Sequence, residues 1–161
     1  MLISEKINHA FNEQIGHELT NSHQYLAIAA YFERESLFGL AKIYYEQADE
    51  ERKHAMKFVK FILDAGGKVA IPAVPAVKSE FSSALDAAQL ALDFELKTTQ
   101  QIYDLVALAT EEKNYMALNF LQWFVGEQLE EVSSAETRLA VIRRAGPSVL
   151  MVEAYLIHDS K

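Results

Sequence analysis

The sequence contains no cysteine and only three prolines. Without cysteine, the chain can form no disulfide, no thiolate metal site and no catalytic thiol. It also lacks a long apolar run of the length that a transmembrane helix needs, so no membrane partner is expected. The first residues turn polar early and have none of the features of a secretory signal peptide. The simplest location for this protein is therefore the cytoplasm.

Basic residues are scarce as well. The chain has 15 Lys and Arg against 23 Asp and Glu, which gives a formal net charge of -8. Binding to phosphates requires a basic face, so nucleic acid is not an expected partner. The acidity has an ordinary explanation in solubility and a second one in the attraction of cations. The length of 161 residues, half of them hydrophobic, suits a single domain spanning residues 1–161.

Apolar side chains recur at steps of three and four residues over four long segments, which predicts four amphipathic helices. Their expected ranges are residues 4–34, 37–65, 83–110 and 115–144. Ser4 and Ser83 are the expected N-caps, and Gly66-Gly67 ends the second helix. Gly146 ends the fourth helix, and Pro147 is expected in the first turn of a short fifth helix that reaches about residue 158.

Residues 66–82 contain Pro72 and Pro75 and have no helical pattern. This segment is too long for a tight turn and indicates a crossover between two antiparallel helix hairpins. The sequence therefore predicts an all-α fold. Its expected form is a four-helix bundle with one long crossover between helices two and three and a short fifth helix at the C-terminus.

Polar residues interrupt the apolar stripes in a pattern that occurs twice. A single offset of 77 residues maps Glu18, Glu50, Glu51 and His54 onto Glu95, Glu127, Gln128 and Glu131. The hairpin turns are expected near residues 36 and 113, and the two copies of the pattern lie at equal distances from their turns. At about 1.5 Å per residue, these side chains reach the same depth, so we expect them to meet inside the bundle.

Several carboxylates in a helical core need a positive charge nearby. The inner stripes supply only His54 and, about two turns beyond Glu131, Arg138. Burying four carboxylates with so little positive charge would cost several kcal/mol. A polar core in which one or two carboxyls stay protonated is the alternative. The pattern favours a metal site.

The ligand types narrow the choice of metal. Carboxylates with one imidazole suit iron or manganese and, less well, zinc. Structural zinc prefers Cys and His, and calcium prefers an oxygen-rich loop. Glu51 lies between the other candidate ligands and is placed to bridge two ions, so iron oxidation is the natural chemistry. A flanking layer of three carboxylates predicts an overflow metal site, with ordinary surface pairs as the alternative: Glu50, Glu127 and Glu130.

Three segments resemble the matching helices of the bacterial non-haem ferritins: EQIGHELTNSHQYLAIAAYF, EQADEERKHAMKF and QWFVGEQLEEVSS. The resemblance covers nearly the whole chain and implies a ferritin-like bundle. It implies that Glu18, Glu51 and His54 hold a first iron, with Glu51 bridging to a second iron held by Glu95 and Glu131. By the same resemblance, Gln128 is a ligand or a supporting residue, and the third iron site comprises Glu50, Glu127, Glu130 and Glu131.

Two aromatic residues also match positions near the family's iron centre. For Tyr25 the resemblance implies a redox or hydrogen-bonding role, and Trp123 is a neighbour of the centre; core packing is the alternative for both. Haem is not expected. Haem-binding bacterioferritins have a Met directly after the Glu of Glu-x-x-His, where this chain has Arg52, and a second Glu-x-x-His in place of Gln128-Leu-Glu-Glu131. Met56 and the off-stripe histidines are expected to pack or to lie at the surface: His9, His17, His23 and His158.

The resemblance further implies what the protein does. Family members are ferroxidases that oxidise Fe(II) with oxygen or peroxide and store ferric mineral inside a cage of twenty-four identical subunits. The fifth helix has apolar surface to bury in such a cage, from Leu150, Val152, Tyr155 and Leu156. Two alternatives remain: a di-metal oxidase or peroxide-consuming protein with little storage role, and a structural cage subunit whose metal site is degenerate.

Overall fold

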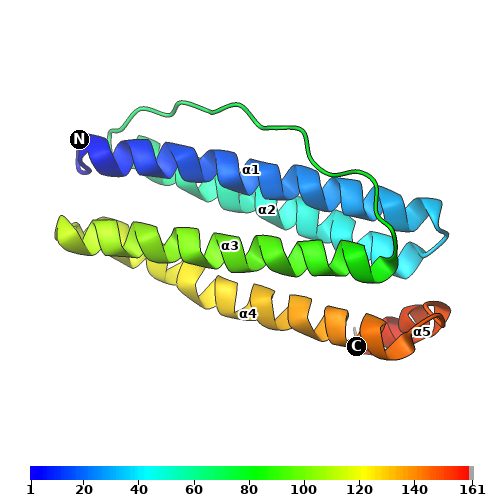
Figure 1. The fold of residues 1–161 in the computed structure, drawn as a ribbon. Coiled ribbons are helices and arrows are strands. Elements are labelled where there is room, and N and C mark those ends of the chain that lie inside the picture. The colour runs from blue at the N-terminus through cyan, green and yellow to red at the C-terminus, as the bar shows by residue number, and fades with distance from the viewer. Residues whose placement is uncertain (160–161) are drawn as a thin grey trace.

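The computed structural model describes residues 1–159, with the side chains of residues 157–159 left out. Five helices make up the fold: α1 (Glu5–Arg34), α2 (Phe38–Asp64), α3 (Ala84–Glu111), α4 (Tyr115–Ala145) and α5 (Leu150–Asp159). The four long helices form an antiparallel bundle, and α5 lies at one end of it (Figure 1). The predicted all-α fold is confirmed. None of the described helices has a stretch apolar enough to span a lipid bilayer.

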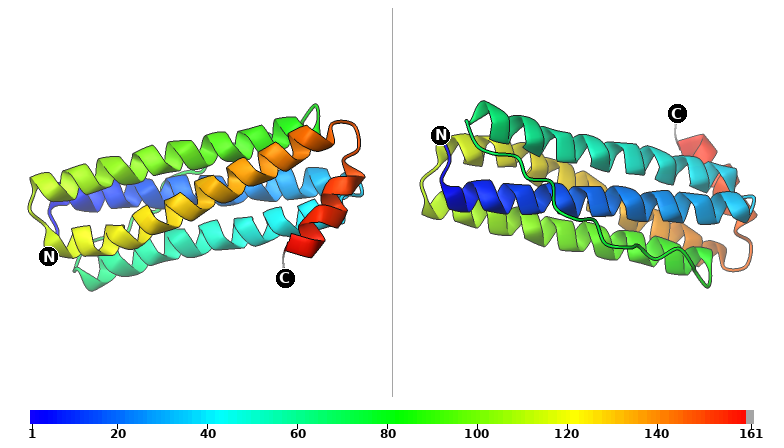
Figure 2. Two further views of the ribbon diagram at one scale, coloured as in Figure 1. Left: turned by 90° about the horizontal axis from the view of Figure 1, so that it is seen from below. Right: turned by 90° about the horizontal axis from the view of Figure 1, so that it is seen from above.

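The crossover between α2 and α3 runs the length of the bundle along α1 (Figures 1 and 2). Side-chain amides of α1 hold its backbone in place. Asn12 donates to the carbonyl of Lys68 at 2.8 Å, and its Oδ1 accepts from the amide of Ala70 at 2.7 Å. Further along, Gln24 exchanges two such bonds with the backbone of Lys78. An extended segment without partners of its own is thereby fixed on the helical surface.

The caps predicted from the sequence are confirmed at two helix starts. The Ser4 hydroxyl accepts from the amide of Ile7, and the Ser83 hydroxyl accepts from that of Asp86, each at 3.1 Å. These bonds satisfy amides that have no partner within the helix. Helix α2 has no cap of its own.

The start of α2 is instead capped by a residue from the other end of the chain. The carboxylate of Glu153 in α5 accepts hydrogen bonds from the amides of Gly39 and Leu40, each at 3.0 Å. A negative charge at this end also complements the positive end of the helix dipole. Glu153 therefore ties α5 to the bundle beside the first turn of α2, where Figure 2 shows it.

The predicted start of α5 was wrong by three residues. Pro147 does not open the helix but lies in the turn that follows α4, and α5 begins at Leu150. Gly146, at φ 54 and ψ -125, leaves the helical region, and the chain needs the next residues to reverse direction. The missing amide of Pro147 costs nothing there. The predicted surface position of His158 lies outside the described side chains.

The apolar core forms two clusters, one at each end of the bundle. One surrounds Phe32, Tyr44 and Leu139. The other surrounds Phe11, Phe58 and Leu121. A layer of buried polar residues separates the two clusters at mid-height. Because the bundle is closed on both sides of this layer, its polar groups are shielded from water.

Candidate metal centre

All four long helices contribute to the polar layer. It consists of six buried side chains that the repeated sequence pattern had singled out: Glu18, Glu51, His54, Glu95, Gln128 and Glu131. Glu18 and Glu95 are 0% exposed. Each follows an apolar residue by three or four positions on the inner face of its helix, so the helical period points it into the bundle. The structure therefore brings these predicted site residues together.

These side chains form two groups of three potential metal ligands. Glu18, Glu51 and His54 make the first group, and Glu51, Glu95 and Glu131 make the second. Within each group, the candidate ligand atoms all lie within 4.8 Å of one another. Glu51 belongs to both groups. Since a carboxylate has two acceptor oxygens, Glu51 can contact one ion in each group.

His54 has carboxylates near both of its ring nitrogens. Its Nδ1 lies 3.2 Å from Oε2 of Glu51 and 3.7 Å from Oε2 of Glu18. Its Nε2 lies 3.9 Å from Oε1 of Glu127. The Nδ1 atom therefore faces the first group, and Nε2 faces the carboxylate behind the ring. A carboxylate in that place fixes the orientation and tautomer of a ligand histidine.

Side-chain amides hold the three outer carboxylates in place. Each donates one hydrogen bond: Gln14 to Oε1 of Glu18 at 2.9 Å, Gln47 to Oε2 of Glu131 at 2.7 Å, and Gln128 to Oε2 of Glu95 at 3.1 Å. A neutral donor orients a carboxylate without neutralising it, so the negative charge stays available to a cation. Gln128, predicted as a ligand or a supporting residue, makes a supporting contact.

Tyr25 contacts the same carboxylate as Gln128. Its hydroxyl donates a short hydrogen bond to Oε1 of Glu95. The ring is buried beside Tyr44 at a centroid distance of 5.9 Å. Burial, together with the charges of Glu95 and Glu51, raises the pKa of Tyr25 well above its ordinary range. The hydroxyl is therefore a proton donor at neutral pH.

Burial and mutual charge separate the pKa values in this layer. Burial, with Glu18 and Glu95 nearby, raises the pKa of Glu51 well above its usual range. Burial also raises the pKa of Glu95 and of Glu131. Burial alone would raise the pKa of Glu18, but hydrogen bonding to His54 and Glu51 outweighs it and lowers the pKa. The pKa of His54 is raised, because contact with Glu18 outweighs burial. The layer therefore holds protons where an incoming cation would displace them.

Unpartnered atoms in the layer test whether a metal suits it. Among the described residues, Oε2 of Glu18, Oε1 of Glu51 and Nε2 of His54 are buried and have no hydrogen-bond partner. Leaving such groups unpaired costs about 1–3 kcal/mol each. The two carboxylate oxygens belong to the first ligand group, and carboxylate with imidazole is a donor set that iron, manganese and zinc accept. The residues present therefore fit divalent cations.

The flanking carboxylates do not form a third group of this kind within the described chain. Glu50 pairs with Lys53 at 3.1 Å, Glu127 faces His54, and Glu130 is exposed on α4. The predicted third metal site therefore stays a prediction. Its carboxylates nevertheless lie on α2 and α4, the two helices that carry His54 and Glu131.

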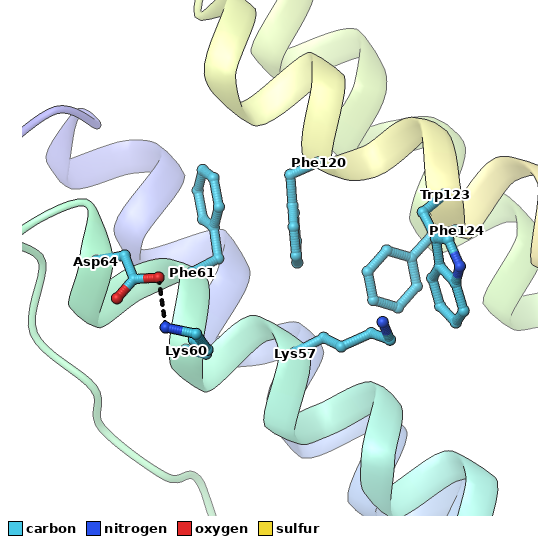
Figure 3. A pocket seen from close by; sticks show the side chains of 7 residues that line it. All are labelled: Lys57, Lys60, Phe61, Asp64, Phe120, Trp123 and Phe124. Atoms are coloured by element: carbon cyan, nitrogen blue, oxygen red, sulfur yellow. Dashed lines mark hydrogen bonds and ion pairs between the residues drawn. The ribbon is translucent and has the colours of Figure 1, made fainter.

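Trp123 lies beside the centre, as the resemblance implied. Its ring makes an edge contact with that of His54 at a centroid distance of 5.4 Å, and Phe124 approaches the same imidazole at 5.9 Å. These two aromatic residues border a shallow cavity of about 260 Å³, where Lys57 lies 4.1 Å from the Trp123 ring centroid (Figure 3). The aromatic side chains therefore separate the imidazole from solvent on this side. Met56 is exposed, contrary to the packing role expected for it.

The remaining histidines that the structure describes lie away from the polar layer. His9, His17 and His23 are exposed on α1. Two supporting residues had no part in the repeated pattern: Gln14 and Gln47. Each lies four residues before a candidate ligand, Glu18 or Glu51, and therefore one helical turn away on the same face. That spacing was the available signal in the sequence.

An antiparallel four-helix bundle with one long crossover, and a carboxylate-rich centre that shares one glutamate between two ligand groups, defines a ferritin-like protein. Comparisons with known proteins agree. The family model described as "Ferritin-like domain" matches residues 8–145. This chain belongs to the ferritin family.

Named relatives and solved structures are similar over nearly their whole length. The chain is 41% identical to ferritin BfrB of Mycobacterium tuberculosis over 154 residues, which cover 96% of this chain and 85% of that protein. It is 38% identical to a bacterial non-heme ferritin of Staphylococcus aureus, over 90% of this chain and 87% of that protein. An open pore ferritin of Archaeoglobus fulgidus superposes with a TM-score of 0.93 at 37% identity, covering 96% of both chains.

Proposed function

We propose that this protein is an iron-storage ferroxidase, which oxidises Fe(II) to Fe(III) and stores the product as a ferric mineral. The observation that carries the proposal is the position of Glu51 in both ligand groups. A carboxylate shared between two groups can hold two ions close enough to react with one oxygen molecule together. Iron storage by the ferritin family supports the choice of iron over manganese or zinc.

The two ligand groups take one substrate ion each. Glu18 and His54 hold the first Fe(II), Glu95 and Glu131 hold the second, and Glu51 bridges them. Gln128 orients Glu95 through the hydrogen bond described above. Glu50, Glu127 and Glu130 form a third site that receives iron beside the centre.

Charge and proton balance favour oxidation in this layer. Each Fe(II) gives up one electron, and oxygen takes the two electrons with two protons to form hydrogen peroxide, which can serve as an oxidant in turn. The anionic ligands stabilise the higher charge of Fe(III) more than that of Fe(II). Tyr25 stays protonated and supports Glu95 as a hydrogen-bond donor. Haem takes no part in this scheme.

Storage requires a container, and the family provides one. We propose a cytoplasmic homo-oligomer of twenty-four subunits that forms a closed shell around the mineral. Similarity over nearly the full length of ferritins supports this assembly. The partners of the protein are then ferrous iron, oxygen or peroxide, and further copies of itself.

A single experiment tests both parts of the proposal. Fe(II) is added in air to the purified metal-free protein and to a Glu51→Ala, His54→Ala variant, ferric absorbance is followed, and both are sized by light scattering. We expect fast oxidation in the parent alone and a particle of about twenty-four subunits in both. Equal rates in the two proteins would exclude the ferroxidase centre. A small oligomer that oxidises iron without retaining it would indicate a di-metal oxidase with no storage role.

A further inference from the structure

A second polar cavity lies between α2, α4 and α5, beside the metal centre. Its volume is about 600 Å³. Its polar lining includes Glu46, Gln47, Glu50, Ser133, Ser134 and Arg138. Nothing in the proposed oxidation uses Arg138, although it was the only cation besides His54 that the inner stripes of the sequence supplied.

The guanidinium group of Arg138 lacks hydrogen-bond acceptors. Its Nε and Nη2 atoms are buried, and neither has a partner among the side chains and backbone that the structure describes. Its Cζ atom lies 5.6 Å from the ring centroid of Tyr44, a cation–π contact that supplies no acceptor in the plane of the guanidinium. A buried arginine with two orphan donors is unfavourable unless an acceptor reaches it.

The carboxylates around the cavity do not provide that acceptor. Glu46 is paired with Lys42 at 3.9 Å, and Glu50 is paired with Lys53 at 3.1 Å. Arg138 has no ion pair with any residue in the described part of the chain. The charge left without a partner at this cavity is therefore positive, in a protein whose formal net charge is -8.

We propose that this cavity binds a tetrahedral oxyanion of the inorganic phosphate class. The guanidinium presents two parallel N–H donors that match two oxygens of such an anion. Ser134 lies one helical turn before Arg138 on the same face of α4, and its hydroxyl, with that of Ser133, adds donors at the rim. Thr137 also lines the cavity, but its hydroxyl donates to the carbonyl of Ser133 at 2.9 Å.

The location gives the anion a connection to the metal centre. Gln47 lines the cavity and donates to Glu131 of the second ligand group at 2.7 Å. Glu50, from the proposed third site, lines the cavity as well. A bound phosphate is thus one side chain away from the iron ligands, where its free oxygens can contact ferric product. This consequence rests on the proposed function, whereas binding of the anion to the metal-free protein does not.

Binding of inorganic phosphate to the metal-free protein tests the proposal directly. Titration calorimetry in a phosphate-free buffer is run on the parent, on Arg138→Gln and on Arg143→Gln, a control with an exposed arginine on the same helix. We expect saturable binding in the parent and in Arg143→Gln, and a loss of affinity of about tenfold or more in Arg138→Gln. Sulfate should compete for the site.

Two further variants guard against misfolding and against a general charge effect. Ser134→Ala leaves the buried charge in place and should weaken phosphate binding by a few fold. Arg138→Lys keeps the charge but loses the fork, and should bind less tightly than the parent and more tightly than Arg138→Gln. Circular dichroism and light scattering check that each variant folds and assembles. Absence of saturable binding in the parent, or equal affinity in parent and folded Arg138→Gln, would overturn the proposal.

Discussion

Tyr25 and Gln128 donate hydrogen bonds to opposite oxygens of one carboxylate, that of Glu95. Both donors are buried, one on α1 and the other on α4, so Glu95 is fixed from two sides. Such support explains how a flexible side chain can present a defined ligand atom in an otherwise apolar bundle.

Replacing Tyr25 with Phe tests whether its hydroxyl acts by positioning. The variant keeps the ring packing but leaves Oε1 of Glu95 without its donor, so we expect a loss of about 1–3 kcal/mol of unfolding free energy. We also expect weaker binding at the second ligand group alone, measured by Co(II) titration. A tyrosyl radical signal during iron oxidation in the parent, absent from Tyr25→Phe, would instead show a redox role.

The two supporting glutamines should act on different ions. Gln14→Leu removes the donor to Glu18, and Gln47→Leu removes the donor to Glu131. Each change should lower the affinity of its own ligand group by about 10–100-fold, as loss of such supporting contacts does at other metal sites. Stepwise Co(II) titration followed by absorbance separates the two ions. Equal effects of both variants on both ions would contradict independent support.

The metal-free protein should become less stable as the pH rises from mild acid to neutral. The folded-state pKa of Glu51 is raised above 4.5, and the folded-state pKa of His54 is raised above 6.5. Each group therefore contributes stability below its unfolded pKa and loses it as the pH rises through the folded one. The lowered pKa of Glu18 acts only below 4.5, outside this window.

Glu51→Gln isolates the contribution of that carboxyl. Glutamine cannot ionise, so the variant should gain stability relative to the parent as the pH rises toward neutral, measured by urea unfolding of both metal-free proteins at several pH values. Titrating groups that the two proteins share, such as the exposed His17, cancel in the difference. A difference that stays constant with pH would contradict the raised pKa of Glu51.

Two glycines give a matched test of how α5 is attached. A methyl group on Gly39 would lie 2.2 Å from Oε2 of Glu153, whereas one on Gly126 would meet nothing within 4 Å. Gly39→Ala should displace the cap of α2 and lower stability by about 1 kcal/mol. Gly126→Ala should be neutral or stabilising by up to about 1 kcal/mol. Thermal unfolding compares the two variants, and equal midpoints would argue against the capping role of Glu153.

The long helices could be predicted from the sequence because their inner faces repeat regularly and their ends carry local signals such as Ser4 and Ser83. The meeting of Glu18, Glu51 and Glu95 was predictable for a related reason, since equal distances from two turns fix equal depths. The start of α5 was not, because the conformation of Gly146 depends on where the following helix packs.

Contacts between distant segments were equally hidden from sequence. The cap that Glu153 places on α2, and the hydrogen bond from Gln47 to Glu131, join residues more than 80 positions apart. Arg138 was visible as a cation on an inner stripe, but its unpartnered nitrogens depend on how α2, α4 and α5 pack around it. Helical periodicity specifies which face a residue occupies, and it leaves open which atom of a neighbouring helix that residue reaches.

The sharing of Glu51 by two ions is the central claim and can be measured directly. Anaerobic titration of the metal-free protein with Fe(II), followed by calorimetry, should give two ions per subunit in the parent. Glu18→Ala and Glu131→Ala should each lose one ion, and Glu51→Ala should lose high-affinity binding of both. If Glu51→Ala retained one ion at the affinity of the parent, Glu51 would not bridge the two groups, and the account of the centre given above would be wrong.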